Sequence, residues 1–159
     1  MKKISKSASS QILIIGYGNT LRGDDGVGYK IAEIIDQWNL NNITSLAVHQ
    51  LTPDLAEKIS QVDTVIFIDA IYVTDMNRAK IEIKTISINR KINNLGHHNN
   101  PEQLLSLTQA IYQKIPLAYW ILVPAVNFNF SESFSSTTQK YARVTLEKIK
   151  IFLSDQSLK

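Results

Sequence analysis

The stretch Ile15-Gly-Tyr-Gly-Asn-Thr-Leu-Arg-Gly-Asp-Asp-Gly-Val-Gly28 decides how this chain folds. It begins at the end of a short apolar run, residues 11–15, that predicts a buried strand, and it leads into a segment with helical periodicity. A helix N-terminus reached through such a turn attracts an anion, because free backbone N–H groups and the positive end of the helix dipole point at it. Here Asp24 and Asp25 already occupy that place. The expected partner of the turn is therefore a cation, a proton or the helix N-terminus itself.

Length and composition predict one globular domain. A chain of 159 residues with 44% hydrophobic content is long enough to bury one substantial core. We expect a flexible leader at residues 1–10, the domain at residues 11–154 and a C-terminal tail at residues 155–159. The leader holds three of the 17 basic residues, so 14 remain in the rest of the chain against 14 acidic ones. This neutral body lacks the basic stripe of a nucleic-acid surface.

The chain contains no signature of secretion or membrane insertion. The leader carries lysines, but the apolar run after it extends only from Ile12 to Ile15, and no small-residue cleavage site precedes it. No segment approaches membrane-spanning length, so we expect a soluble cytoplasmic protein with no membrane partner. The absence of cysteine excludes disulfides, thiolate nucleophiles and zinc sites that use sulfur. Any metal must be held by Asp, Glu, His or backbone oxygen.

Strand and helix patterns alternate along the chain. We expect strands at residues 11–15, 44–51, 62–70, 80–88 and 117–126, and helices at residues 27–38, 101–112 and 135–153, with a short helix after Thr52-Pro53. The strand at 80–88 alternates apolar and polar residues, which is typical of a half-exposed edge strand. In the helix 101–112, the residues expected to face inward are Leu104, Leu105, Leu107, Thr108 and Ile111.

This alternation predicts an α/β fold with right-handed crossovers and a mainly parallel sheet covered on both faces. In such sheets, ligands bind beyond the C-terminal ends of the strands, where the strand order reverses. If strands 11–15 and 62–70 are neighbours there, the loop of Asp24 and Asp25 meets the strand end that carries Asp69. Three carboxylates would then share one crevice.

Each of these residues also has a simpler interpretation. The dinucleotide fingerprint fails, because Leu21 stands at its third glycine and two acids lie where a pyrophosphate would bind. One of Asp24 and Asp25 is expected to cap the following helix, which leaves the other free. Asp69 could accept hydrogen bonds from nearby amides, as a strand-end aspartate does. The apolar run before it favours a place on the crevice floor, where an idle charge is costly.

Histidines supply the remaining candidate ligands. His97 and His98 lie in a polar loop before the helix that starts at Pro101, and we expect one of them to be solvated. A histidine beside two carboxylates makes a site suited to nickel, zinc or iron(II). His49, at a strand end, is expected to pack or to support a ligand. The metalloprotease H-E-x-x-H, serine hydrolase G-x-S-x-G and aspartic protease Asp-Thr-Gly signatures are absent.

With these motifs, the chain resembles the maturation endopeptidases of nickel-iron hydrogenases, which remove a C-terminal extension from the hydrogenase large subunit after nickel insertion. The resemblance covers nearly the whole length. It is carried by Gly16-Tyr-Gly-Asn-Thr-Leu-Arg-Gly-Asp-Asp-Gly-Val-Gly28, by Phe67-Ile-Asp-Ala70 and by His98 ahead of Asn-Asn-Pro-Glu-Gln-Leu-Leu105. The stretch 126–134 also resembles the late loop of this family.

The resemblance implies a three-layer α/β/α sandwich with a mainly parallel, twisted sheet of about five strands. It also implies a metal-contacting and catalytic trio at Asp25, Asp69 and His98. Asp25 stands where some members of the family carry Glu. His98 is preferred to His97 because its spacing to Pro101 fits the loop of the family better.

The resemblance further implies nickel as the metal and a hydrogenase large-subunit precursor as the partner. Two carboxylates and an imidazole make a modest nickel site, whereas the precursor offers soft cysteine ligands for the same ion. We therefore expect the substrate to carry the nickel, and the trio to complete its coordination and fix the tail for hydrolysis. Without nickel, the tail is not positioned. Nickel could polarise the scissile carbonyl, or dock the tail while a carboxylate activates water.

Three alternative functions remain. The same ligands and a water could form an autonomous metal hydrolase, which would keep its metal and cleave simple peptides or esters. A nucleotide-binding module would bind NAD or ATP, although the acidic loop argues against it. A docking factor in hydrogenase assembly would use the acidic loop only as a structural cap, and would tolerate Asn at Asp25 and Asp69.

Overall fold

A five-stranded sheet runs through the centre of the computed structural model, which describes residues 9–88 and 100–157. The strands are β1 (Ile12–Tyr17), β2 (Ile43–Val48), β3 (Thr64–Tyr72), β4 (Glu82–Thr85) and β5 (Leu117–Ala125). Their order is β2-β1-β3-β5-β4, and all neighbours are parallel except β4 and β5.

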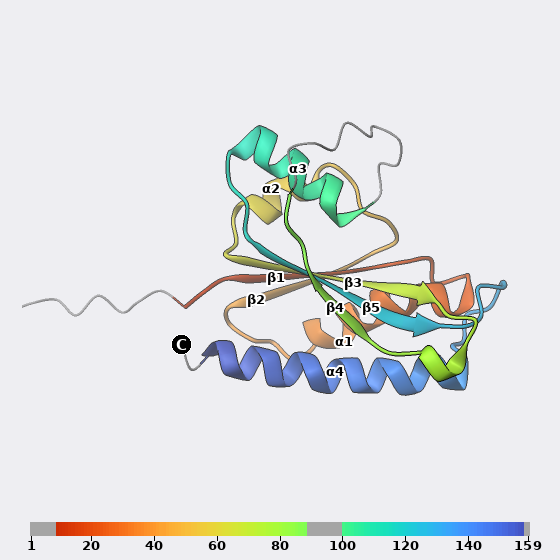
Figure 1. The fold of residues 1–159 in the computed structure, drawn as a ribbon. Helices are drawn as coiled ribbons and strands as arrows, with labels where there is room; N and C mark the ends of the chain where they lie inside the picture. The colour runs from red at the N-terminus through yellow and green to blue at the C-terminus, as the bar shows by residue number, and fades with distance from the viewer. Residues whose placement is uncertain (1–8, 89–99, 158–159) are drawn as a thin grey trace, which may run out of the picture.

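Helices cover both faces of this sheet. They are α1 (Val27–Asp36), α2 (Leu55–Ser60), α3 (Pro101–Tyr112) and α4 (Ser136–Ser157), with 3-10 turns η1 (Gly23–Gly26) and η2 (Met76–Arg78). Figure 1 shows α1 and α4 on one face, and α2 and α3 on the other. The predicted three-layer α/β/α sandwich with a mainly parallel sheet of about five strands is confirmed.

The chain order reverses between β1 and β3. These strands are parallel neighbours, with Ile15 opposite Phe67 and Gly16 opposite Ile68. After β1, the chain continues through α1 to β2, which lies on one side of β1. It then continues through α2 to β3, which lies on the other side of β1. The loop after β1 and the end of β3 therefore lie together at the carboxyl edge of the sheet, where parallel α/β sheets bind ligands.

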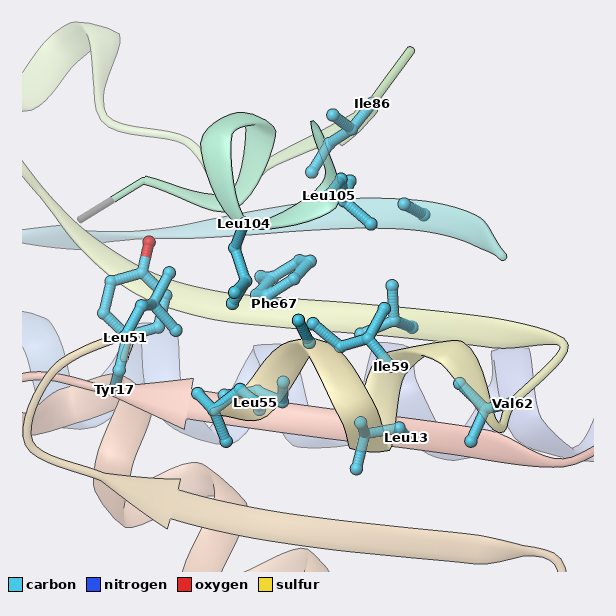
Figure 2. Close-up of a cluster of buried hydrophobic side chains, with 14 residues drawn as sticks. Leu13, Tyr17, Leu51, Leu55, Ile59, Val62, Phe67, Ile86, Leu104 and Leu105 are labelled. Carbon is cyan, nitrogen blue, oxygen red and sulfur yellow. The ribbon is translucent and has the colours of Figure 1, made fainter. Parts of the chain in front are cut away.

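Strand alternation divides the core into two clusters. On the face of α1 and α4, Ile12 and Ile14 of β1 pack with Ile66 and Ile68 of β3. On the face of α2 and α3, Leu13, Ile15 and Tyr17 of β1 pack with Phe67. Figure 2 shows the second cluster, in which the residues from the helices and loops include Leu51, Leu55, Ile59, Leu104 and Leu105. Apolar burial on both faces holds the strand ends in fixed positions.

Several element bounds differ from the sequence pattern. β1 continues to Tyr17, β4 is limited to Glu82–Thr85, and α4 continues to Ser157, which is within the segment predicted as a tail. The inward position predicted for Ile111 is wrong, because this side chain is 58% exposed. The buried stripe of α3 consists of Pro101, Leu104, Leu105 and Thr108. It ends one turn before the helix does.

Among the residues that the structure describes, no helix is long and apolar enough to span a bilayer.

Candidate active site

Glycines bring the first loop close to the sheet. A Cβ atom on Gly16 would lie 1.9 Å from the carbonyl oxygen of Gly28, and one on Gly28 would lie 2.2 Å from the carbonyl oxygen of Ile68. The start of α1 therefore packs directly on β1 and β3, at a separation that only glycine allows. This contact fixes the loop that carries Asp24 and Asp25 beside the carboxyl end of β3.

Asp24 anchors this loop from inside the protein. Its side chain is fully buried. Its carboxylate accepts hydrogen bonds from the N–H groups of Val126 (3.0 Å), Asn127 (2.9 Å) and Ser135 (2.7 Å), and from the Ser135 hydroxyl (2.8 Å). Burial alone would raise the pKa of Asp24, but the donors of Val126, Ser135 and Asn127 outweigh it and hold the pKa below its ordinary value. Asp24 is therefore a charged residue with a structural role.

Backbone hydrogen bonds join the same two loops. The N–H of Gly23 donates to the carbonyl of Ser131 (2.8 Å), the N–H of Asp24 donates to that of Asn127 (2.9 Å), and the N–H of Ser131 donates to that of Leu21 (3.0 Å). The N–H groups of Gly23 and Asp24 in the first loop thus already have acceptors within the protein. They are therefore not available to bind a phosphate. The loop after β5 is thereby positioned next to the candidate site.

The prediction that Asp24 or Asp25 caps the following helix is wrong. Gly26 is the N-cap residue of α1, and no side chain caps this helix. Asp24 instead bonds to the loop after β5, while Asp25 accepts a hydrogen bond from the N–H of Asn19 at 2.8 Å. The predicted group of three carboxylates is thus reduced to two, because Asp24 is fully buried among its own donors. Asp25 is partly exposed, and its charge acts on Asp69.

Asp69 lies near the end of β3 and is partly buried. One of its carboxylate oxygens accepts a hydrogen bond from the N–H of Ala70 at 2.8 Å, as expected for a strand-end aspartate. Burial raises the pKa of Asp69 to about 6, the Tyr17 hydroxyl and the Ala70 N–H oppose this increase, and the charge of Asp25 adds to it. Asp25 and Asp69 are therefore close enough to interact electrostatically. A carboxylate with this pKa is a stronger base than an ordinary aspartate.

Two aromatic residues on the same face of the sheet as Asp69, Tyr17 and Trp120, were not predicted from the sequence as site residues. Tyr17 is the residue after Gly16, which pairs with Ile68, so it lies next to Asp69 on the face of α2 and α3. Trp120 pairs with Phe67 on the other side of β3. Burial, followed by the charge of Asp69, raises the pKa of the Tyr17 phenol. The strand alternation through Leu13 and Ile15 was the signal that could have identified Tyr17.

The histidine of the predicted trio is not placed by the structure. His97 and His98 lie outside the described residues, which resume at Asn100. Asn100 caps α3 through a hydrogen bond from the N–H of Gln103 at 2.8 Å. Figures 1 and 2 both show that α3 starts on the side of the carboxyl ends of β1 and β3, and thus on the side of Asp69.

The remaining histidine is a packing residue. The His49 ring, just after β2, stacks on Tyr29 with 5.0 Å between centroids and 17° between planes. Within residues 9–88 and 100–157, no three His, Cys, Asp or Glu side chains form a metal-binding group. Of the predicted ligands, Asp25 and Asp69 are the two that lie within the described residues.

The fold and this edge define a class of α/β proteins with paired carboxylates at the point where the strand order reverses. The chain has the fold of the [NiFe] hydrogenase maturation proteases. It is similar to the maturation protease HycI from Thermococcus kodakarensis KOD1, with a TM-score of 0.69, 21% identity, and coverage of 93% of this chain and 95% of that one.

Similar agreement is found with a second solved structure. The hydrogenase maturating endopeptidase HybD from E. coli superimposes with a TM-score of 0.72 and 21% identity, covering 91% of this chain and 93% of that one. Neither a protein-family profile nor a curated protein sequence matches the chain significantly.

Proposed function

We propose that this chain is an endopeptidase that removes the C-terminal extension of a nickel-iron hydrogenase large-subunit precursor after nickel insertion. In this proposal Asp25, Asp69 and His98 recognise the nickel ion, which the precursor carries as part of the substrate. The protein itself needs no resident metal.

One observation carries the proposal. Asp25 and Asp69 come from segments more than forty residues apart in the sequence, and their charges interact at the edge where β1 and β3 adjoin. Two carboxylates in such a place repel each other, and a cation removes this repulsion. The shared fold with the maturation proteases supports a peptide as the substrate that brings the cation.

The types of ligand atom also support the proposal that the nickel stays with the precursor. Carboxylate oxygens and an imidazole are weaker nickel ligands than thiolates, so they complete a coordination sphere without extracting the ion. Contact with nickel then fixes the tail of the precursor beside the two carboxylates, which lowers the entropic cost of reaching the hydrolytic geometry. A nickel-free precursor lacks this contact, so its tail is not held for cleavage.

The test is to incubate the purified protein with nickel-loaded and nickel-free precursor, and to follow loss of the C-terminal peptide by mass spectrometry. We expect cleavage of the loaded precursor alone. Asp25→Asn and Asp69→Asn should each abolish cleavage, because Asn preserves shape but not charge. Asp36→Asn, at the exposed end of α1, is the matched control and should cleave normally.

Each unexpected result has a distinct meaning. Equal cleavage of both precursors would contradict recognition through nickel. Processing that survives both site substitutions would instead favour a docking role for the acidic loop. If the wild-type protein binds nickel but cleaves neither precursor, the proposed peptidase activity is contradicted.

A further inference from the structure

Two buried polar groups beside Asp69 have no role in the function proposed above. Within the described part of the chain, neither the Tyr17 hydroxyl nor the Trp120 indole nitrogen has a hydrogen-bond partner of normal geometry. The Tyr17 side chain is only 7% exposed. An unpaired buried donor costs roughly 1–3 kcal/mol, so a purely apolar core would favour Phe at both positions.

The sheet register places these two donors on the strands that flank β3, which carries Asp69. Tyr17 follows the Gly16–Ile68 pair on β1, and Trp120 pairs with Phe67 on β5. Both side chains belong to the α2 and α3 face, where Asp69 also lies because it is two residues beyond Phe67. Figure 2 shows the Tyr17 ring next to Leu51, with its hydroxyl directed away from β1 toward the layer of α3.

The chemistry of these groups gives them an order. The indole of Trp120 is a donor only, the phenol of Tyr17 is both donor and acceptor, and an ionised Asp69 accepts. Asp69 and Trp120 act on Tyr17 at hydrogen-bonding range, and the charge of Asp25 acts on it as well. The arrangement permits only one direction of donation, from Trp120 through Tyr17 to Asp69.

We propose that Trp120 and Tyr17 form a hydrogen-bond relay, from Trp120 Nε1–H to Tyr17 Oη and from Tyr17 Oη–H to Asp69, that orients the Asp69 carboxylate toward its ligand. This inference rests on the proposed function for the identity of the ligand, but the relay itself does not depend on it. Ala70 already donates to one oxygen of Asp69. A second donor fixes the plane of the carboxylate, as partners of metal-binding side chains do.

The relay is tested first without any ligand. The chain contains two tryptophans, Trp38 and Trp120, so two indole N–H signals are expected in a proton–nitrogen NMR spectrum. Tyr17→Phe should move the Trp120 signal upfield and speed its exchange with solvent, because the acceptor is removed. Asp69→Asn should also move it, through Tyr17. The Trp38 signal should stay in place, because that ring contacts a different residue, Lys150, whose Nζ lies 5.2 Å from the ring centroid.

A matched variant separates the relay from general effects of removing a hydroxyl. Tyr72, at the end of β3, is 59% exposed, so Tyr72→Phe should leave both indole signals unchanged. The carboxyl carbon signal of Asp69 should change in Tyr17→Phe and not in Tyr72→Phe. An unchanged Trp120 signal and an unchanged Asp69 signal in Tyr17→Phe would overturn the relay.

The orienting role is tested with Cd²⁺ alone, by calorimetry. Tyr17→Phe should weaken Cd²⁺ binding about tenfold, as loss of partners that hold metal ligands does. Tyr72→Phe should bind Cd²⁺ like the wild-type protein. Equal affinity of Tyr17→Phe and wild type would overturn the orienting role. Failure of the wild-type protein to bind Cd²⁺ would overturn the orienting role, and failure to process nickel-loaded precursor would count against the proposed function. The NMR signals would decide the relay in either case.

Discussion

The surroundings of Asp24 and Asp69 differ, although both carboxylates lie at the carboxyl edge of the sheet. Asp24 is fully buried and accepts four hydrogen bonds from Val126, Asn127 and Ser135. Asp69 is partly exposed, accepts a hydrogen bond from Ala70, and lies beside the charge of Asp25. The first carboxylate is stabilised by the folded protein and the second is destabilised by it. A difference of this kind is what we expect between a residue that builds a site and one that binds a ligand.

The largest expected change in the free energy of unfolding is that of Asp24→Asn. The new amide directs N–H groups at backbone donors, so at neutral pH we expect a loss of roughly 3 kcal/mol in the free energy of unfolding, measured with urea. Asp36→Asn is the matched control and should change the free energy by less than about 0.5 kcal/mol.

The effect of Asp24→Asn should also depend on pH. The folded pKa of Asp24 lies below the ordinary value of 3.8, so the stability that its charge contributes is complete above 3.8. It is lost as the pH falls through the lower folded pKa. The difference between variant and wild type should therefore shrink in acid. A constant difference would show that the charge of Asp24 is not the cause.

Asp69→Asn should change the free energy of unfolding in the opposite direction to Asp24→Asn, and by a smaller amount. Folded Asp69 keeps its proton up to a pKa of about 6, whereas the unfolded chain releases it near 3.8, so stability falls as the pH rises between these values. The variant has no such loss, and above pH 6 it should be more stable than wild type by roughly 2 kcal/mol. Below the unfolded pKa the two should agree. Urea unfolding on both sides of this interval measures the change, and a destabilised variant at neutral pH would contradict it.

The sequence predicted what local pattern and topology determine. The apolar run before Asp69 is recognised from a few residues, and so are the glycines of the turn before Asp25. The rule for parallel sheets then brings both to one edge once β1 and β3 are neighbours.

The role of Asp24 could not be predicted in this way. Its donors Val126, Asn127 and Ser135 are more than 100 residues away, and no local pattern in either loop indicates the pairing. The two adjacent aspartates look equivalent in sequence, and only the position of the loop after β5 distinguishes them. The exposure of Ile111 is a second example, because the extent of the neighbouring layer, not helical periodicity, decides where the buried stripe ends.

The smallest effect concerns Ser135, the residue that links Asp24 to α4. Its hydroxyl donates to Asp24 at 2.8 Å and accepts from the N–H of Thr138 at 3.2 Å, so it joins the buried carboxylate to the first turn of the helix. Ser135→Ala should cost about 1–2 kcal/mol in urea unfolding, the usual range for a lost cap. Ser136→Ala, at an exposed position in the same turn, is the control and should be nearly neutral.

Combining Ser135→Ala with Asp24→Asn tests whether the two side chains act together. Each single variant removes the same bond between hydroxyl and carboxylate, so the double variant should lose less than the sum of the two single losses. Additive losses would mean that Ser135 stabilises α4 independently of Asp24. The loop after β5 would then be held by the backbone donors alone, and the contrast between Asp24 and Asp69 would rest on Val126 and Asn127.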